Sequence, residues 1–169
     1  MTRYPLRRLR LRPGDEQRDA VAIELEAFEL GGQRYLPVPQ EVEAALTVAQ
    51  ATTGLDLRLG FEARLHGPCM RCLEDAALEI RVDAREYHAA AAGGDDELQS
   101  EYVLEDQLEL TAWARDTIAL ALPDQILHDP DCAGLCPVCG KDLNVAPHTH
   151  DDVSNDPRWS ALESLRDRL

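Results

Sequence analysis

The sequence predicts an α+β protein, in which an antiparallel β-sheet is packed against one helix and pinned by pairs of cysteines. Three observations support this prediction. Long stretches alternate apolar and polar residues with a period of two, which is typical of strands with one buried face. One stretch has clear helical periodicity. All five cysteines fall in two short clusters. The length of 169 residues suits a single domain, and we expect residues 1–169 to form one.

The strand pattern is strongest in the first half of the chain. Apolar and polar residues alternate over residues 21–26 and 41–51, and the faultless alternation over residues 55–66 predicts the best strand. Glycines 31–32 and the prolines that follow predict a loop between the first two strands. A further alternation over residues 78–85 predicts the antiparallel partner of the longest strand, so the first cysteine pair should lie at a hairpin tip.

The second half of the chain is predicted to contain the helices. Residues 109–122 place Leu110, Ala114 and Ile118 on one apolar stripe, and Pro123 ends the pattern, so this helix should pack on the sheet. Residues 88–100 lack a sustained period and are predicted to form a mobile loop. A short C-terminal helix is expected at residues 156–169, because Asp156-Pro157 suits a helix start.

The two cysteine clusters predict a metal site. The first is Cys69-Met70-Arg71-Cys72, and the second contains Cys136-Pro137-Val138-Cys139-Gly140, whose proline and glycine favour a tight turn. Two such pairs supply four thiolates, the ligand set of a closed, tetrahedral zinc site. We therefore predict a zinc-knuckle pair in which Cys69, Cys72, Cys136 and Cys139 hold one structural zinc ion. Because the spacer between the pairs exceeds that of an ordinary zinc ribbon, the pairing must be remote in sequence.

Other readings of the clusters remain open. Cys132 is the odd cysteine, and it is an alternative ligand in place of Cys136 or Cys139. Disulfides and buried free thiols are the non-metal alternatives. His128, His148 and His150 lie near the second cluster, but histidines in polar loops are usually solvated, and we expect these to be so.

Charge restricts the class of partner. The net charge is −15, and the chain has one lysine against 32 acidic residues, which argues against a broad surface for nucleic-acid phosphates. A basic protein is the better partner. The N-terminus is the exception, because Arg8, Arg10 and Arg12 alternate with leucines as on an edge strand. That strand face is either solvated or in weak contact with RNA phosphates.

The sequence also argues against a membrane protein and against an enzyme. No stretch approaches the roughly 20 apolar residues of a membrane span, and arginines occupy the start of the chain where a signal peptide needs an apolar run, so we expect a soluble, cytoplasmic protein. Motifs of zinc proteases, P-loop proteins and nucleophile elbows do not occur. A site rich in cysteine thiolates is closed, whereas a catalytic zinc keeps an open position. We therefore expect a binding protein and not an enzyme.

The sequence also resembles a known family. The hairpin-tip CMRC, the helix ending in LALP, the segment CAGLCPVCGKDLN and the terminal DPRWSALESL resemble the YceD family of large ribosomal RNA subunit accumulation proteins. The resemblance runs from about Leu55 to Leu165. Cys69 and Cys72 match the CxRC of the family, Cys136 and Cys139 match the CPxCG of many members, and Cys132 matches a family cysteine that follows a His-Asp pair.

The resemblance implies a function. It implies a non-enzymatic factor that supports accumulation or processing of large-subunit ribosomal RNA and assembly of the ribosome. In that family the gene often neighbours that of a small zinc-ribbon protein of the large ribosomal subunit, which makes this basic protein the expected partner. The alternative is a zinc-ribbon adaptor for protein–protein contacts unrelated to ribosomes.

Overall fold

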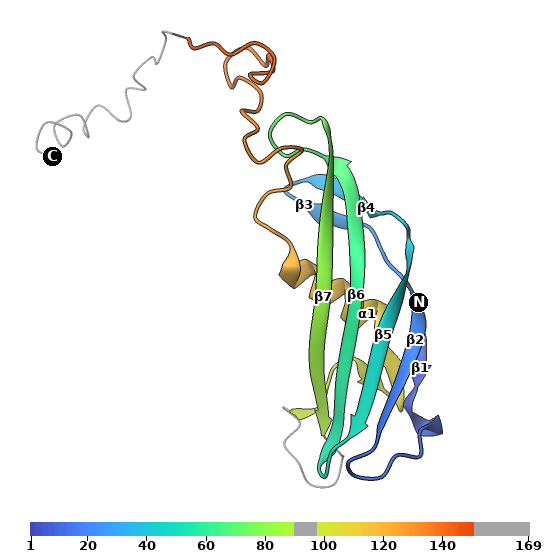
Figure 1. Ribbon diagram of the computed structural model, residues 1–169. Helices are drawn as coiled ribbons and strands as arrows, with labels where there is room; N and C mark the ends of the chain where they lie inside the picture. The colour runs from blue at the N-terminus through green and yellow to red at the C-terminus, as the bar shows by residue number, and fades with distance from the viewer. Residues whose placement is uncertain (90–97, 151–169) are drawn as a thin grey trace, which may run out of the picture.

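The computed structural model describes residues 1–89 and 98–150, and Figure 1 shows a tall, curved antiparallel sheet with a helix on its far side. The described residues are mostly antiparallel β-strands with one helix, which confirms the α+β class. The elements are β1 (Arg3–Pro5), the 3-10 turn η1 (Leu6–Arg8), β2 (Glu16–Glu24), β3 (Phe28–Leu30), β4 (Gln33–Pro37), β5 (Glu41–Gln50), β6 (Gly54–Pro68), β7 (Asp75–Ala89), β8 (Val103–Leu104), β9 (Gln107–Glu109) and α1 (Leu110–Ala121).

The main sheet is built around the long hairpin of β6 and β7. These strands pair along their whole length, from Gly54 opposite Ala89 to Pro68 opposite Asp75. The strand order continues from β6 through β5 to β2, and β6 also pairs with β4, which pairs with β3. Alternate side chains point to one face, as the sequence pattern predicts, and form the core. Its fully buried members include Ile23, Leu46, Val48, Leu57, Leu59 and Leu65.

Helix α1 covers the apolar face of this sheet. Its buried residues include Leu110, Trp113, Ala114 and Ile118, which recur at helical spacing, and the chain leaves the helix just before Pro123. The helix predicted from the sequence is thus confirmed. Figure 1 shows α1 lying behind the strands, and the chain after it climbs toward the end of the sheet where the β6–β7 hairpin turns.

A second, three-stranded sheet was not predicted. Its order is β1-β9-β8, and its strands contain only two or three residues each, too few to show a period. It ties the N-terminus to the helix start, where the backbone N–H of Leu110 donates to the carbonyl of Thr2 at 3.0 Å.

Two local predictions were wrong. Residues 28–37 form the β3–β4 hairpin and not a loop, because Gly31 and Gly32 adopt positive φ and make a tight turn. Residues 8–12 form the end of η1 and an irregular segment and not an edge strand. The alternation nevertheless separates the side chains, since Leu9 and Leu11 pack against the core while Arg8, Arg10 and Arg12 are exposed.

Two further predictions concern parts of the chain that the structure leaves out. Of the predicted loop at residues 88–100, the first two residues complete β7, and residues 90–97 lie outside the described part. The predicted C-terminal helix at residues 156–169 also lies outside the described residues. Within residues 1–89 and 98–150, no helix has the length and apolarity to cross a bilayer.

Candidate metal centres

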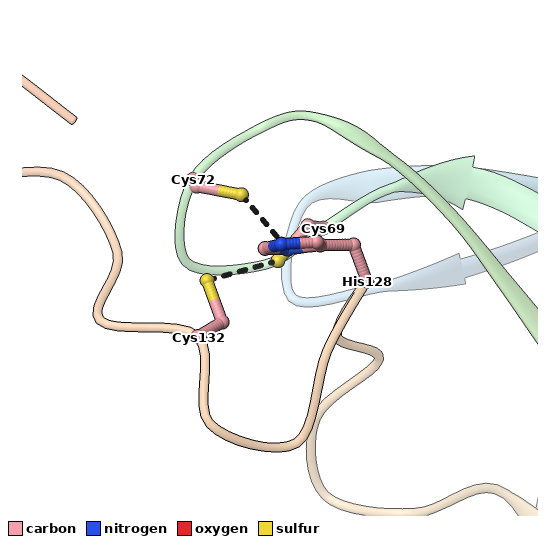
Figure 2. Close-up of side chains that lie close together, drawn as sticks. All are labelled: Cys69, Cys72, His128 and Cys132. Carbon is pink, nitrogen blue, oxygen red and sulfur yellow. Dashed lines mark hydrogen bonds between the residues drawn. The ribbon is translucent and has the colours of Figure 1, made fainter. Parts of the chain in front are cut away.

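One group of metal-ligand side chains lies at the tip of the β6–β7 hairpin. It consists of Cys69, Cys72, His128 and Cys132, whose ligand atoms all lie within 4.8 Å of one another, and we call it the first centre. The sulfurs of Cys69 and Cys132 are 3.8 Å apart, and the Cys72 sulfur lies 3.2 Å from Nδ1 of His128. Figure 2 shows the four side chains converging from the hairpin turn and from the segment after α1. The three cysteines are buried.

The hairpin turn holds its two cysteines through backbone hydrogen bonds. The N–H of Cys69 donates to the carbonyl of Glu74, and the N–H of Leu73 donates to the carbonyl of Cys69 at 3.0 Å. Leu73 takes a positive φ of 67° to close this turn. Cys69 and Cys72 therefore face the same side of the turn, as chelation by a Cys-x-x-Cys pair requires.

The segment after α1 is fastened to the hairpin tip. Met70 and Ile126 contact each other twice, through a 2.9 Å backbone hydrogen bond from the Met70 N–H and through the Ile126 N–H, which lies 3.3 Å from the Met70 sulfur. Ile126 is buried. These contacts carry the chain across the tip and deliver His128 and Cys132 to the first centre.

Arg71 fixes the position of Cys132. Its guanidinium Nη1 donates to the carbonyl of Cys132 at 3.0 Å, and its own carbonyl accepts from the N–H of Leu135 at 3.0 Å. Gly134 passes so close that a Cβ there would lie 3.2 Å from the Arg71 Cβ and carbonyl oxygen, and its φ is +78°. Glycine is needed at this position on both grounds.

The thiols of the first centre are crowded. Burial raises the pKa of Cys69, but hydrogen bonds from His128 and from backbone N–H groups outweigh it and lower the pKa to about 5. Burial, together with the sulfurs of Cys69 and Cys132, raises the pKa of Cys72 to about 12. One thiolate therefore opposes ionisation of the next, and a bound divalent cation is what would let all three ionise.

His128 is oriented as a ligand would be. Its Nδ1 faces Cys72, and its Nε2 lies 3.9 Å from the carboxylate of Glu74. A carboxylate behind the non-ligating nitrogen is the usual arrangement of a metal-bound histidine. The hydrogen bond with Cys69 raises the pKa of His128, which without a metal favours an imidazolium–thiolate pair.

A second group follows directly in the chain. We call Cys136, Cys139, His148 and His150 the second centre, and their ligand atoms also lie within 4.8 Å of one another. Nε2 of His148 is 3.1 Å from the Cys139 sulfur, and the two imidazole rings are 5.0 Å apart. Backbone N–H groups at Cys139 and Val138 are among the causes that lower the pKa of Cys136 to about 6. Cys139 and His150 are exposed, unlike the cysteines of the first centre.

The structure thus divides the four cysteines that the sequence suggested as one ligand set. Cys69 and Cys72 lie with Cys132, the alternative ligand, while Cys136 and Cys139 lie in the second centre. The reason is the path of the chain after α1, which reaches the hairpin tip at Ile126 and leaves only Cys132 close enough. The spacing of the two Cys-x-x-Cys motifs in the sequence does not show this path.

The histidines lie beside the cysteines. We expect His128, His148 and His150 to be solvated, and His128 and His150 are exposed, but each also places a ring nitrogen within 4.8 Å of cysteine sulfurs. Two sequence signals were available: a histidine four residues before Cys132, and a His-x-His pair shortly after the CPxCG turn.

Together these features define a class of protein. Each centre offers four nitrogen and sulfur ligands and could bind a metal ion, and four protein ligands leave no open position for a substrate or an activated water. The class is therefore an α+β protein with two candidate metal-binding groups, the first of which joins a β-hairpin to the chain beyond the helix.

Comparison with known proteins identifies the family. The chain belongs to the YceD family, described as large ribosomal RNA subunit accumulation protein YceD, whose profile matches residues 57–166. The match contains both centres completely. Membership implies a role in the accumulation of large-subunit ribosomal RNA.

Curated relatives lie in mycobacteria. The chain is 30% identical over 150 residues to uncharacterized protein Mb2951c of Mycobacterium bovis and to uncharacterized protein Rv2926c of Mycobacterium tuberculosis, covering 86% of this chain and 68% of each relative. No solved structure matches this chain.

Proposed function

We propose that this protein is a non-enzymatic factor that supports large-subunit ribosomal RNA accumulation by binding a basic protein of the assembling subunit. The observation that carries the proposal is the family match over residues 57–166, which includes most of β6 and all of β7, α1 and both centres. The alternative, an adaptor unrelated to ribosomes, has no comparable support.

The first centre supports a binding role and not catalysis. Its three buried thiols and one imidazole form a closed set for zinc, which prefers tetrahedral sulfur and nitrogen ligands. We propose that zinc bound there fastens the hairpin tip to the segment after α1. The hydrogen bonds of Arg71 and Ile126 hold the ligands in place, so the bound ion would complete an arrangement that the chain already favours.

The acidic surface supports a basic partner. The net charge is −15, and several arginines already face acidic side chains, which leaves the surplus acids to set the field around the molecule. These pairs are Arg3 with Glu109, Arg7 with Asp106, Arg81 with Glu62, and Arg85 with Asp56. A basic large-subunit protein, with the zinc-ribbon protein as the first candidate, would associate at a rate that falls as salt rises.

We propose that the N-terminal arginines are a local exception to the acidic surface and contact RNA weakly. Arg8, Arg10 and Arg12 are exposed, while Leu9 and Leu11 anchor the segment on the core. Three cations can hold a few phosphates but cannot support the tight, broad contact of a dedicated RNA-binding surface.

Depletion of the protein in its own organism tests the proposed function. Sucrose-gradient profiles should show a deficit of large subunits, restored by the unaltered chain. Unchanged subunit ratios after depletion would contradict the ribosomal role.

A pull-down tests the partner. At low ionic strength the tagged chain should recover a basic large-subunit protein, and recovery should survive nuclease because the contact is between proteins. The Arg8→Ala, Arg10→Ala, Arg12→Ala variant is the matched control, and it should recover the same protein. Loss on nuclease treatment, or recovery of small-subunit proteins alone, would overturn the partner assignment.

A further inference from the structure

The two Cys-x-x-Cys turns have the same backbone geometry. In the first, Cys69 N–H donates to the carbonyl five residues on at 2.6 Å, and the residue four positions on returns a hydrogen bond of 3.0 Å to the carbonyl of Cys69. In the second, Cys136 makes the equivalent bonds with Lys141 and Gly140, both at 2.8 Å. The residue after the second cysteine has a φ of 67° in one turn and 71° in the other. Each turn therefore presents two sulfurs in the same way.

The second turn has its own support beyond this geometry. Leu135 and Asp142 form an antiparallel bridge on either side of it. The N–H of Leu143 donates to the carbonyl of Gly134 at 2.9 Å, and Ala146 N–H donates to Asp142. These bonds turn the chain back on itself and bring residues 148–150 over the two cysteines. All four ligands thus come from residues 136–150.

His148 of the second centre is placed as a ligand. Nδ1 of His148 lies 2.8 Å from the carbonyl of Ala146, and because a carbonyl only accepts, Nδ1 must carry the proton. In the neutral imidazole Nε2 is then unprotonated, and it lies 3.1 Å from the sulfur of Cys139. A backbone carbonyl that sets the histidine tautomer in this way is typical of metal-bound imidazole.

We propose that the chain binds two zinc ions and that the second centre, formed by Cys136, Cys139, His148 and His150, is a separate site held by one short segment. The inference rests on the metal-binding part of the proposed function and not on its ribosomal part. Since the thiols of the first centre are buried and Cys139 and His150 are exposed, the second ion exchanges faster. Since its ligands are local, the second ion orders residues 136–150 without supporting the sheet.

Metal content of the purified full chain tests the proposal. The unaltered protein should hold two zinc ions, and the Cys136→Ser, Cys139→Ser variant and the His148→Ala, His150→Ala variant should each hold one. The matched control is His66→Ala, an exposed histidine on β6 outside both centres, which should keep both ions. Thermal unfolding of the sheet should change little in the two second-centre variants. Circular dichroism checks that they keep the β-sheet.

Cobalt substitution gives a second readout on the same proteins. With Co²⁺ as the probe, the thiolate charge-transfer absorption should fall by about two-fifths in the Cys136→Ser, Cys139→Ser variant, because two of the five cysteines are removed. A chromophoric chelator should remove one zinc ion quickly from the unaltered chain and the other slowly, and the fast phase should be absent from that variant.

The contrary outcomes are distinct. One zinc ion in the unaltered chain that both variants retain would overturn the second centre and leave the first intact. Loss of all zinc from the Cys136→Ser, Cys139→Ser variant would show that one ion is shared by the two cysteine pairs, and would also overturn the proposal. A normal ribosome profile after depletion would refute the ribosomal role and leave the metal count unaffected.

Discussion

The guanidinium of Arg71 donates a hydrogen bond of 3.0 Å to the backbone carbonyl of Cys132. Arg71 belongs to the hairpin turn, and Cys132 belongs to the segment after α1, so this contact joins the two parts of the chain that supply the first centre. The hydrogen bond brings the two ligand-bearing segments together. Its removal should therefore affect both folding and metal retention.

Replacing Arg71 tests this relationship. Arg71→Ala removes a charge-assisted hydrogen bond and should lower the free energy of unfolding by about 1–2 kcal/mol. It should also speed release of zinc from the first centre to a chelator. Arg64→Ala, at an exposed position of β6, is the control and should change neither quantity. Equal behaviour of the two variants would show that Arg71 does not organise the centre.

The positive φ of Leu73 predicts a stabilising substitution. A leucine at φ 67° is strained, and its side chain is 56% exposed, so little burial is lost when it is replaced. Leu73→Gly should raise the melting temperature, with a gain of about 1 kcal/mol. The reverse change, Gly140→Leu, introduces the same strain in the second turn and should weaken zinc binding there. A lower melting temperature for Leu73→Gly would mean that the leucine side chain makes contacts that outweigh the strain.

The Asp56–Arg85 pair should make the stability of the protein depend on pH. Hydrogen bonds from Arg85 hold the pKa of Asp56 below its usual range in the folded state. This pair therefore contributes its full stability above the pKa of an unfolded aspartate, about 3.9, and loses it as pH falls through the lower folded value. Asp56→Asn should cost about 0.5–1 kcal/mol at pH 7 and progressively less below pH 4. Denaturant unfolding of both proteins at pH 7 and below pH 4 measures this cost at each pH. A cost that is the same at both pH values would show that the Asp56–Arg85 pair is not its cause.

The N-terminal arginines predict a small, salt-dependent effect on RNA. Replacing Arg8, Arg10 and Arg12 with alanine should weaken RNA binding and flatten its dependence on salt, since each lost phosphate contact lowers the slope by about one. Titration of a labelled ribosomal RNA fragment over a salt series measures both. If affinity and slope do not change, these arginines form a solvated surface.

The sheet could be predicted because its pattern is local. The alternation over residues 55–66 and 78–85 shows directly which side chains are buried in β6 and β7, and the hairpin places Cys69 and Cys72 at its tip. The short strands β8 and β9 could not be found in this way, because two or three residues show no period and because β9 also depends on pairing with β1, about 100 residues earlier in the chain.

The ligand sets could be predicted only in part, for a similar reason. Cysteine spacing identified the two turns, but the partners of each turn depend on where the chain runs after α1. The contacts of Ile126 with Met70 fix the path of this segment. An isolated isoleucine in an irregular segment has no sequence pattern that marks it as an anchor. His148 and His150 depend in turn on the fold of residues 136–150.

The first centre has a mechanical consequence for the chain. Its ligands are 56 residues apart between Cys72 and His128, and 63 apart between Cys69 and Cys132. An ion bound there would close a covalent ring containing β7 and α1, as a disulfide would. Closing such a ring in the unfolded chain removes entropy worth roughly 4 kcal/mol. Unlike a disulfide, this cross-link would form and open with the concentration of free metal, so the metal supply of the cell, and not its oxidants, would determine whether the hairpin tip and the segment after α1 are cross-linked.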